Sequence, residues 1–137
     1  MKYYISFFRN YFNFSGRTRR AGYWVPHIIN GFIISILFIL GLFCGLPHNP
    51  DAHIENPEYT TTFIWVNCII FFFLLLTFIP SLSSTVRRLH DINRSGWWIF
   101  LNFLPLAGPI ALFIYYCQDS GNDNQYGPKP DKINFTV

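Results

Sequence analysis

Residues 63–86, FIWVNCIIFFFLLLTFIPSLSSTV, contain no Lys, Arg, Asp or Glu, and this stretch decides the class of fold. Two further runs, 23–46 and 97–117, share this property, so the charged residues all lie outside the three runs. A helix rises about 1.5 Å per residue, so about 20 apolar residues cross the roughly 30 Å of hydrocarbon in a bilayer. The three runs therefore predict an all-α membrane protein with three transmembrane helices.

The composition agrees with this class. The chain of 137 residues is 51% hydrophobic, 20% aromatic and only 12% charged, which is about half the charged share of a soluble domain. The first run is longer than the roughly 7 to 15 apolar residues of a cleaved signal peptide. We expect a single domain over 1–137, with an outer loop at 47–62, a basic connection at 87–96 and a polar tail at 118–137.

The basic residues predict the orientation, because Lys and Arg close to helix ends stay on the cytoplasmic side. Eight of the ten precede the first run or lie between the second and the third: Lys2, Arg9, Arg17, Arg19, Arg20, Arg87, Arg88 and Arg94. The loop 47–62 holds acidic residues and no Lys or Arg. The amino terminus is therefore predicted to be cytoplasmic, and three crossings then leave the carboxyl tail outside.

The aromatic residues agree with three crossings, since Trp and Tyr collect where headgroups meet hydrocarbon. Trp24, Trp97 and Trp98 begin spans at the cytoplasmic face in this arrangement. Tyr115 and Tyr116 then end the third span at the outer face.

Residues 2–14 predict an amphipathic helix that lies along the membrane surface. At 100° per residue the aromatic and aliphatic side chains fill one arc, and Lys2, Arg9 and the small polar residues fill the other. The alternative is a short helix packed against the spans.

The connection after the second run is the densest in polar chemistry. If its helix continues past the membrane, Arg87, His90, Asp91 and Arg94 share one face. Arg holds phosphate oxygens with two parallel bonds, so anionic lipid headgroups or another phosphorylated ligand are the expected partners. Alternatively, the charges only set the topology and Asp91 neutralises a neighbouring Arg. The candidate ligand residues are Arg17, Arg20, Arg87, Arg88, His90, Asp91 and Arg94.

Each apolar run carries one asparagine: Asn30, Asn67 and Asn102. An amide in hydrocarbon seeks a partner, so these residues predict hydrogen bonds between helices, with a polar vestibule open to the cytoplasm as the alternative. Ser95 is expected to cap the third helix. Pro105, Gly108 and Pro109 predict a kink inside that helix.

The sequence predicts no catalytic residue, no metal site and no cofactor. Cys44, Cys68 and Cys117 all lie in apolar runs, and no CxxC pair, phosphate loop or HExxH motif is present. Because no carboxylate lies within the runs, the sequence also disfavours a proton-coupled or cation pump. No nucleic-acid partner is expected.

Three stretches together resemble the DUF805 family of small bacterial inner-membrane proteins, also called YhaH-like. They are Phe14-Ser15-Gly16-Arg17 with Arg20, Tyr23 and Trp24; Arg87-Arg88-Leu89-His90-Asp91 with Arg94-Ser95-Gly96-Trp97-Trp98; and Asn124-Gln125-Tyr126-Gly127-Pro128 with Pro130. The chain departs from the family pattern at Gly22, where an acidic residue is expected. The resemblance implies a multi-pass protein of the bacterial cytoplasmic membrane and supplies no activity.

Three functions follow as hypotheses. The first is a non-enzymatic membrane component whose Arg-rich cytoplasmic face engages anionic lipid or a protein partner, as a homo-oligomer or accessory subunit. The second is an oligomeric transporter or channel component with a path lined by the three asparagines. The third is a lipid-phosphate enzyme with His90 and Asp91 as acid and base.

Overall fold

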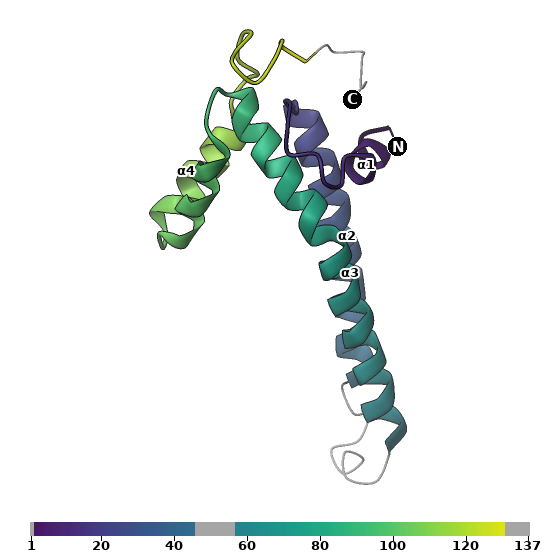
Figure 1. Ribbon diagram of the computed structural model, residues 1–137. Coiled ribbons are helices and arrows are strands. Elements are labelled where there is room, and N and C mark those ends of the chain that lie inside the picture. Colours follow the sequence, from purple (N-terminus) through teal and green to yellow (C-terminus); the bar gives the residue numbers. More distant parts are fainter. Residues whose placement is uncertain (1, 46–56, 131–137) are drawn as a thin grey trace. The chain divides into compact units, whose positions relative to one another are not determined.

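The computed structural model describes residues 2–45 and 57–130, and its regular elements in these ranges are helices. They are α1 (Lys2–Arg9), α2 (Arg20–Gly45), α3 (Pro57–Asp91), the 3₁₀ helix η2 (Gly96–Phe103) and α4 (Ala107–Cys117) (Figure 1). The predicted all-α class is confirmed. Most of the predicted outer loop and the end of the polar tail lie outside the described residues.

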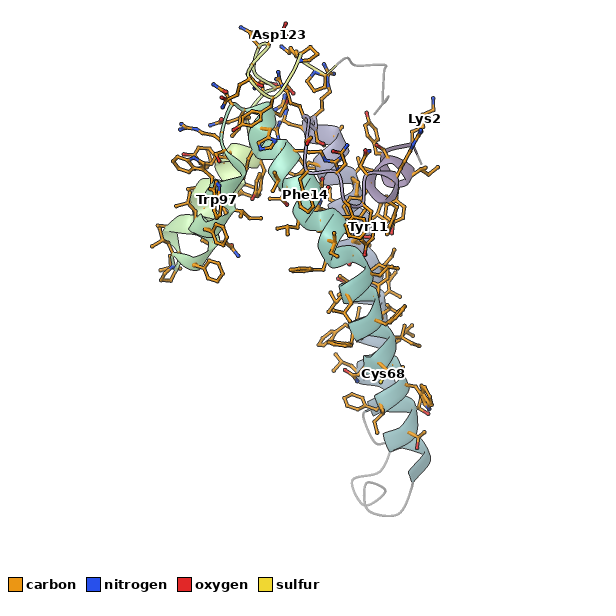
Figure 2. The ribbon with its side chains drawn as sticks, viewed as in Figure 1. Lys2, Tyr11, Phe14, Cys68, Trp97 and Asp123 are labelled. Atoms are coloured by element: carbon orange, nitrogen blue, oxygen red, sulfur yellow. The ribbon has the colours of Figure 1, made fainter. Side chains whose placement is uncertain are left out.

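Two helices are long and apolar enough to cross a membrane, over Arg20–Phe43 in α2 and Thr61–Asp91 in α3. Their large apolar side chains are mostly exposed, as at Phe71 (64%) and Phe72 (70%). Figure 2 shows such side chains around the part of α3 that carries Cys68. The core helix of a soluble protein would bury these groups, so hydrocarbon is the solvent that suits them.

The chain divides into two compact units. One unit is 28–77, in which α2 and α3 approach closely at Gly41, where a Cβ atom would lie 3.2 Å from a methyl group of Val66. The other unit, which we call the polar unit, comprises 1–27 and 78–137. It holds α1, the beginning of α2, the end of α3, η2, α4 and the described part of the tail, and it contains all the side chains discussed below except Asn30 and Asn67.

The third apolar run forms a helical hairpin in which η2 and α4 pack against each other (Figure 1). The ring centroids of Trp98 and Tyr115 lie 5.7 Å apart. The Arg94 guanidinium lies 4.9 Å from the Trp98 ring and 5.6 Å from the Tyr115 ring. A continuous helix would separate residues 98 and 115 by about 25 Å along its axis. The structure therefore has a hairpin where the sequence predicted a single helix over 97–117, and the predicted third crossing is not confirmed.

The hairpin turn has a local cause. Pro105 has no N–H to donate, and Leu106 adopts a left-handed φ of 65°, so the helix stops before them. Gly108 then lies so close to the Leu101 carbonyl that a Cβ atom would overlap it. These residues break the helix where the sequence predicted only a kink. The predicted cap is confirmed, since the Ser95 hydroxyl accepts from the Trp97 N–H at 3.4 Å.

The hairpin brings the tail back to the amino-terminal segment. The Trp24 indole donates to the Tyr116 carbonyl at 3.3 Å, and the Gly121 N–H donates to the Asp91 carbonyl at 3.1 Å. Arg17 of the amino-terminal segment also donates to the Gly127 carbonyl of the tail at 2.9 Å. The predicted position of the tail on the opposite side of the membrane is therefore not confirmed. The physical reason is the hairpin, which reverses the chain once more.

The amino-terminal helix is shorter than predicted, because α1 ends at Arg9 and a turn follows. Phe7 is 3% exposed and packs edge-on against His27, with ring centroids 5.9 Å apart. The single proton of the buried Ser83 hydroxyl is shared between the Asn10 and Asn13 carbonyls, at 3.0 and 2.8 Å from Oγ. Ile5 and Phe12 remain exposed. The segment thus packs through one aromatic ring and leaves other apolar side chains outside.

Candidate functional site

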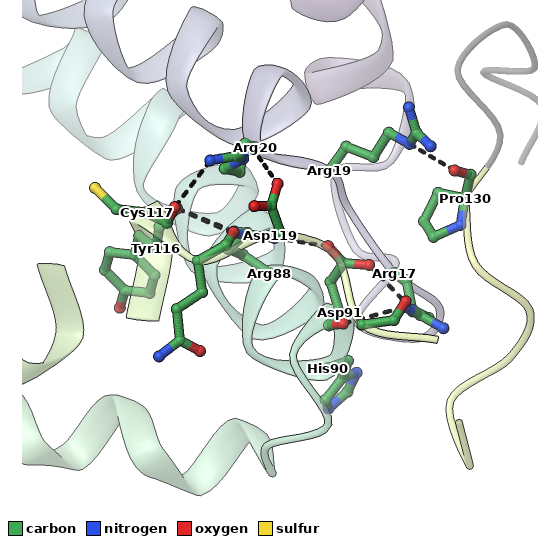
Figure 3. A network of polar contacts seen from close by, with 12 residues as sticks. Arg17, Arg19, Arg20, Arg88, His90, Asp91, Tyr116, Cys117, Asp119 and Pro130 are labelled. Carbon is green, nitrogen blue, oxygen red and sulfur yellow. Dashed lines mark hydrogen bonds and ion pairs between the residues drawn. The ribbon is translucent and has the colours of Figure 1, made fainter. Parts of the chain in front are cut away.

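The centre of the polar unit is a buried ion cluster of Arg17, Arg88 and Asp91 (Figure 3). Arg17 Nε lies 3.1 Å from one carboxylate oxygen of Asp91, and Arg88 Nη1 lies 2.6 Å from the other. The three side chains are at most 2% exposed. Two guanidiniums share one carboxylate, so the cluster needs further acceptors to satisfy its remaining N–H groups.

Backbone carbonyls supply those acceptors for Arg17. Its Nη1 donates to the Asn122 and Gly127 carbonyls, both at 2.9 Å. Its Nη2 donates to the carbonyls of Asp91 and Gly121 at 3.1 and 2.7 Å. With the bond to the Asp91 carboxylate, all five N–H donors of this guanidinium are used. Arg17 therefore ties the tail to the end of α3.

Two other arginines cap the carboxyl end of α4, whose last carbonyls have no partner within the helix. Arg88 donates to the Tyr116 carbonyl from Nε and Nη2, at 3.2 and 3.1 Å, and to the Gln118 carbonyl. Arg20 donates to the Cys117 carbonyl at 3.1 Å and pairs with Asp119 (Figure 3). Positive charge at this end of a helix is also favourable for the helix dipole.

His90 and Arg94 make ring contacts. The His90 ring stacks on Tyr126 at 3.8 Å with an interplanar angle of 3°, and His90 Nδ1 lies 3.3 Å from the Gly16 carbonyl. Arg94 lies over the rings of Trp98 and Tyr115, as cations do on aromatic faces. These contacts join the end of α3 to the tail and to the hairpin.

Arg87 differs from its neighbour Arg88. Its side chain lines a cavity of about 410 Å³ within the polar unit, between α1, the segment that leads into α2, the end of α3 and the tail. Arg87 is 6% exposed, and its Nε donates to the Ser83 carbonyl at 3.3 Å. Ser84, one helical turn earlier, lines the same cavity. The other basic residues of the cavity wall are Arg17, Arg19 and Lys129.

Arg94 does not belong to the face predicted to hold Arg87, His90 and Asp91, because α3 ends at Asp91 and Arg94 follows a turn. Asp91 neutralises two arginines instead. Arg17, Arg20, Arg88 and Asp91 come together as structural contacts, whereas Arg87 borders the cavity. The three motifs that resemble one family are thus joined in one place.

The three asparagines have different surroundings. Asn67 donates to the Phe63 carbonyl of its own helix at 2.8 Å, as an intrahelical contact. Asn30 is buried at 6% exposure. Asn102 lies in η2 and lines a second cavity of about 380 Å³ beside Trp24 and Tyr116. Hydrogen bonds between helices at these positions stay a prediction.

Sequence reasoning did not assign Arg19, Ser84 or Lys129 to a binding site, and all three line the larger cavity. The tail motif was the only signal for Lys129, since that residue lies inside it. Ser84 is one of three serines close together in α3, and only its rotation relative to Ser83 distinguishes it.

Comparisons with known proteins agree with the helical membrane class. A family model described as "Protein of unknown function (DUF805)" matches residues 11–128. Inner membrane protein YhaI of Escherichia coli strain K12 is 35% identical over 131 residues, covering 95% of this chain and 96% of that protein. Inner membrane protein YhaH of the same strain is 30% identical over 131 residues, covering 95% and 97%. No solved structure matches the chain.

Proposed function

The chain belongs to the DUF805 family of proteins of unknown function. We propose that it is a non-enzymatic inner-membrane component whose basic polar unit binds anionic lipid headgroups at the cytoplasmic face of the membrane. The observation that carries this proposal is the bonding of Arg17 and Arg88 to backbone carbonyls of the tail. The described residues of the polar unit include nine of the ten basic residues, and the tenth, Lys132, lies outside the described residues.

The proposed topology has two crossings, by α2 and α3, with both the amino-terminal segment and the tail in the cytoplasm. Lys and Arg near helix ends remain on the cytoplasmic side. The loop that joins the two helices has no Lys or Arg, which suits the opposite side. This arrangement accounts for Lys129 as well as for the basic residues before α2 and after α3.

The hairpin of η2 and α4 is proposed to enter the membrane from the cytoplasmic side and to return. Eight residues of 3₁₀ helix and eleven of α-helix each extend about 16 Å, roughly half of the hydrocarbon thickness. The tip is apolar and exposed, with Phe103 at 83% and Leu106 at 82%. The Leu104 and Gly108 N–H groups near the turn are already hydrogen-bonded to carbonyls, which lowers the free-energy cost of placing the turn in hydrocarbon.

The amino-terminal segment is proposed to lie at the membrane surface. Phe7 holds α1 to the polar unit, while Ile5 and Phe12 are exposed beside Lys2 and Arg9. Apolar side chains beside basic ones suit the boundary of an anionic bilayer.

The ion cluster supports a non-enzymatic role. Each carboxylate oxygen of Asp91 already accepts a hydrogen bond from an arginine. His90 is stacked on Tyr126 and faces the Gly16 carbonyl through Nδ1. The geometry therefore favours these residues as structural contacts over an acid and base pair.

Reporter fusions test the topology. We expect alkaline phosphatase fused after Val137 to be inactive and a fluorescent protein at the same place to be bright, because the tail is cytoplasmic. A phosphatase inserted after Tyr59 should be active and serves as the control. An active phosphatase after Val137 would contradict the proposal.

Lipid retention tests the basic polar unit. In full-length protein, Lys2→Gln with Arg9→Gln should reduce the phosphatidylglycerol that remains bound in native mass spectra, because both side chains are exposed. The matched control is Lys2→Arg with Arg9→Lys, which preserves both charges. Equal retention by the neutral and the charged pair would argue against headgroup binding by α1.

A further inference from the structure

The cavity of about 410 Å³ in the polar unit has a positive wall. Four basic side chains line it and no Asp or Glu does, among the residues that the structure describes. Arg17 is already paired with Asp91 and has used all its donors. The charge that the cavity presents therefore comes mainly from Arg87, Arg19 and Lys129.

Arg87 is buried without a counter-charge among the residues that the structure describes. The only hydrogen bond of its side chain within the described part of the chain runs from Nε to the Ser83 carbonyl, so its two terminal nitrogens keep four donors unused. A guanidinium removed from water is costly unless an anion or several acceptors replace the lost hydration. Arg88 and Arg17, equally buried, have those acceptors.

Ser84 supplies a second and independent observation. It is 1% exposed, and its Oγ is the one buried side-chain polar atom with no hydrogen-bond partner in the described residues. Ser84 and Arg87 are three positions apart on α3, so their side chains project from one face of the helix, and both line the cavity. Orphaned buried hydroxyls are rare and call for an explanation.

We propose that this cavity binds a phosphate group, held by the terminal nitrogens of Arg87 and by the Ser84 hydroxyl. A guanidinium offers two parallel donors that match two oxygens of one phosphate, and the hydroxyl donates to a third. Lys129, exposed at the rim, adds charge at the entrance. The volume falls in the range of small-ligand sites and leaves room for the group that the phosphate is attached to.

This inference rests on the proposed function for the cytoplasmic position of the cavity. The same chemistry fits two sources, the headgroup of an anionic phospholipid and a soluble phosphate compound. The experiment therefore has two arms. One measures binding of glycerol 3-phosphate to purified full-length protein in a neutral detergent, and the other measures retention of phosphatidylglycerol against phosphatidylcholine from mixed nanodiscs.

Two variants decide the outcome. Arg87→Gln should weaken phosphate binding about 100-fold, and Ser84→Ala should weaken it about 10-fold, as expected for hydrogen bonds to a charged group. Ser84→Ala should also unfold at the same or a higher temperature when no phosphate is present, because it removes an unpartnered hydroxyl. A purely structural serine would show the opposite change. This variant keeps the test decisive should Arg87→Gln fail to fold.

Matched controls are Ser81→Ala and Arg94→Gln, since neither residue lines the cavity. If the cavity variants, and not the controls, lost glycerol 3-phosphate binding, the ligand would be a soluble phosphate compound. If they lost phosphatidylglycerol retention, the ligand would be a lipid headgroup. If Ser84→Ala and every folded Arg87 variant bound both probes as well as the controls do, the proposal would be overturned. If the phosphatase fused after Val137 were active and the cavity variants still lost probe binding, the proposed topology would be refuted and the phosphate site would be supported.

Discussion

Two sets of residues in the last turns of α3 can be compared, because each set contains an arginine and the two arginines are in opposite states. In the first set, Arg88 and Asp91 are bonded to each other, to Arg17 and to the Gln118 carbonyl of the tail. In the second set, the Arg87 side chain has one long hydrogen bond and the Ser84 hydroxyl has none within the described residues. The comparison teaches that residue type does not separate a structural arginine from a binding one, whereas the count of satisfied donors does.

The largest expected effect comes from Asp91→Asn, which removes the carboxylate that two buried arginines share. Breaking such a cluster costs about 3 to 5 kcal/mol, because uncompensated charges stay buried. We expect the tail to detach and the purified protein to lose its monodisperse elution in detergent, measured with fluorescence-detected size exclusion. Normal elution and unchanged thermal stability would show that the ion cluster does not hold the tail in place.

The neighbouring arginines allow a direct contrast. Arg88→Lys keeps the charge but loses the fork that reaches the Tyr116 and Gln118 carbonyls, so unfolding should become easier by about 2 kcal/mol. Arg87→Lys should change the unfolding free energy by less than about 1 kcal/mol, since it loses one long hydrogen bond. Thermal unfolding followed by tryptophan fluorescence measures both. Equal losses of unfolding free energy in the two variants would contradict the distinction between Arg88 and Arg87.

The neighbouring serines give a smaller contrast. Ser83→Ala deletes the hydrogen bond that the hydroxyl shares between two carbonyls of the turn after α1, and it should cost about 1 to 2 kcal/mol. Ser84→Ala deletes none, and its melting temperature should equal or exceed that of the parent protein. Protease sensitivity of the segment after Arg9 is a second measure, and it should rise only in Ser83→Ala.

The smallest effect is expected for Tyr126→Leu, which removes the ring that stacks on His90. The loss should be about 1 kcal/mol, the value of one aromatic pair. Phosphate binding should weaken only modestly, because Tyr126 borders the cavity without supplying its charge. A collapse as large as that of Asp91→Asn would mean that the stack, and not the ion cluster, holds the tail.

The long apolar helices could be predicted from sequence because their cause is local. An uncharged run of sufficient length has few alternatives to a helix in lipid, and α2 and α3 are present as such helices. The Ser95 cap was predictable for the same reason, since a cap depends on residues two or three positions away.

The hairpin and the cavity could not be predicted in this way. Hydropathy alone does not distinguish one crossing at 97–117 from two half-length helices, because both bury the same apolar side chains in lipid. The contact of Trp98 with Tyr115 decides between them, and it joins residues distant in sequence. Likewise, the periodicity of α3 separates Arg87 from Arg88 by about 100°, but only the packed neighbours determine which one meets acceptors.

One consequence of the ion cluster concerns sequence divergence. Arg17 and Arg88 bind the tail through its main-chain carbonyls at Gln118, Gly121, Asn122 and Gly127. Every amino acid has a main-chain carbonyl oxygen, so the side chains at positions such as 118 and 122 can be exchanged without loss of these hydrogen bonds. A deletion of a single residue there would shift every later carbonyl out of place, and this segment should therefore tolerate substitutions far better than changes in length.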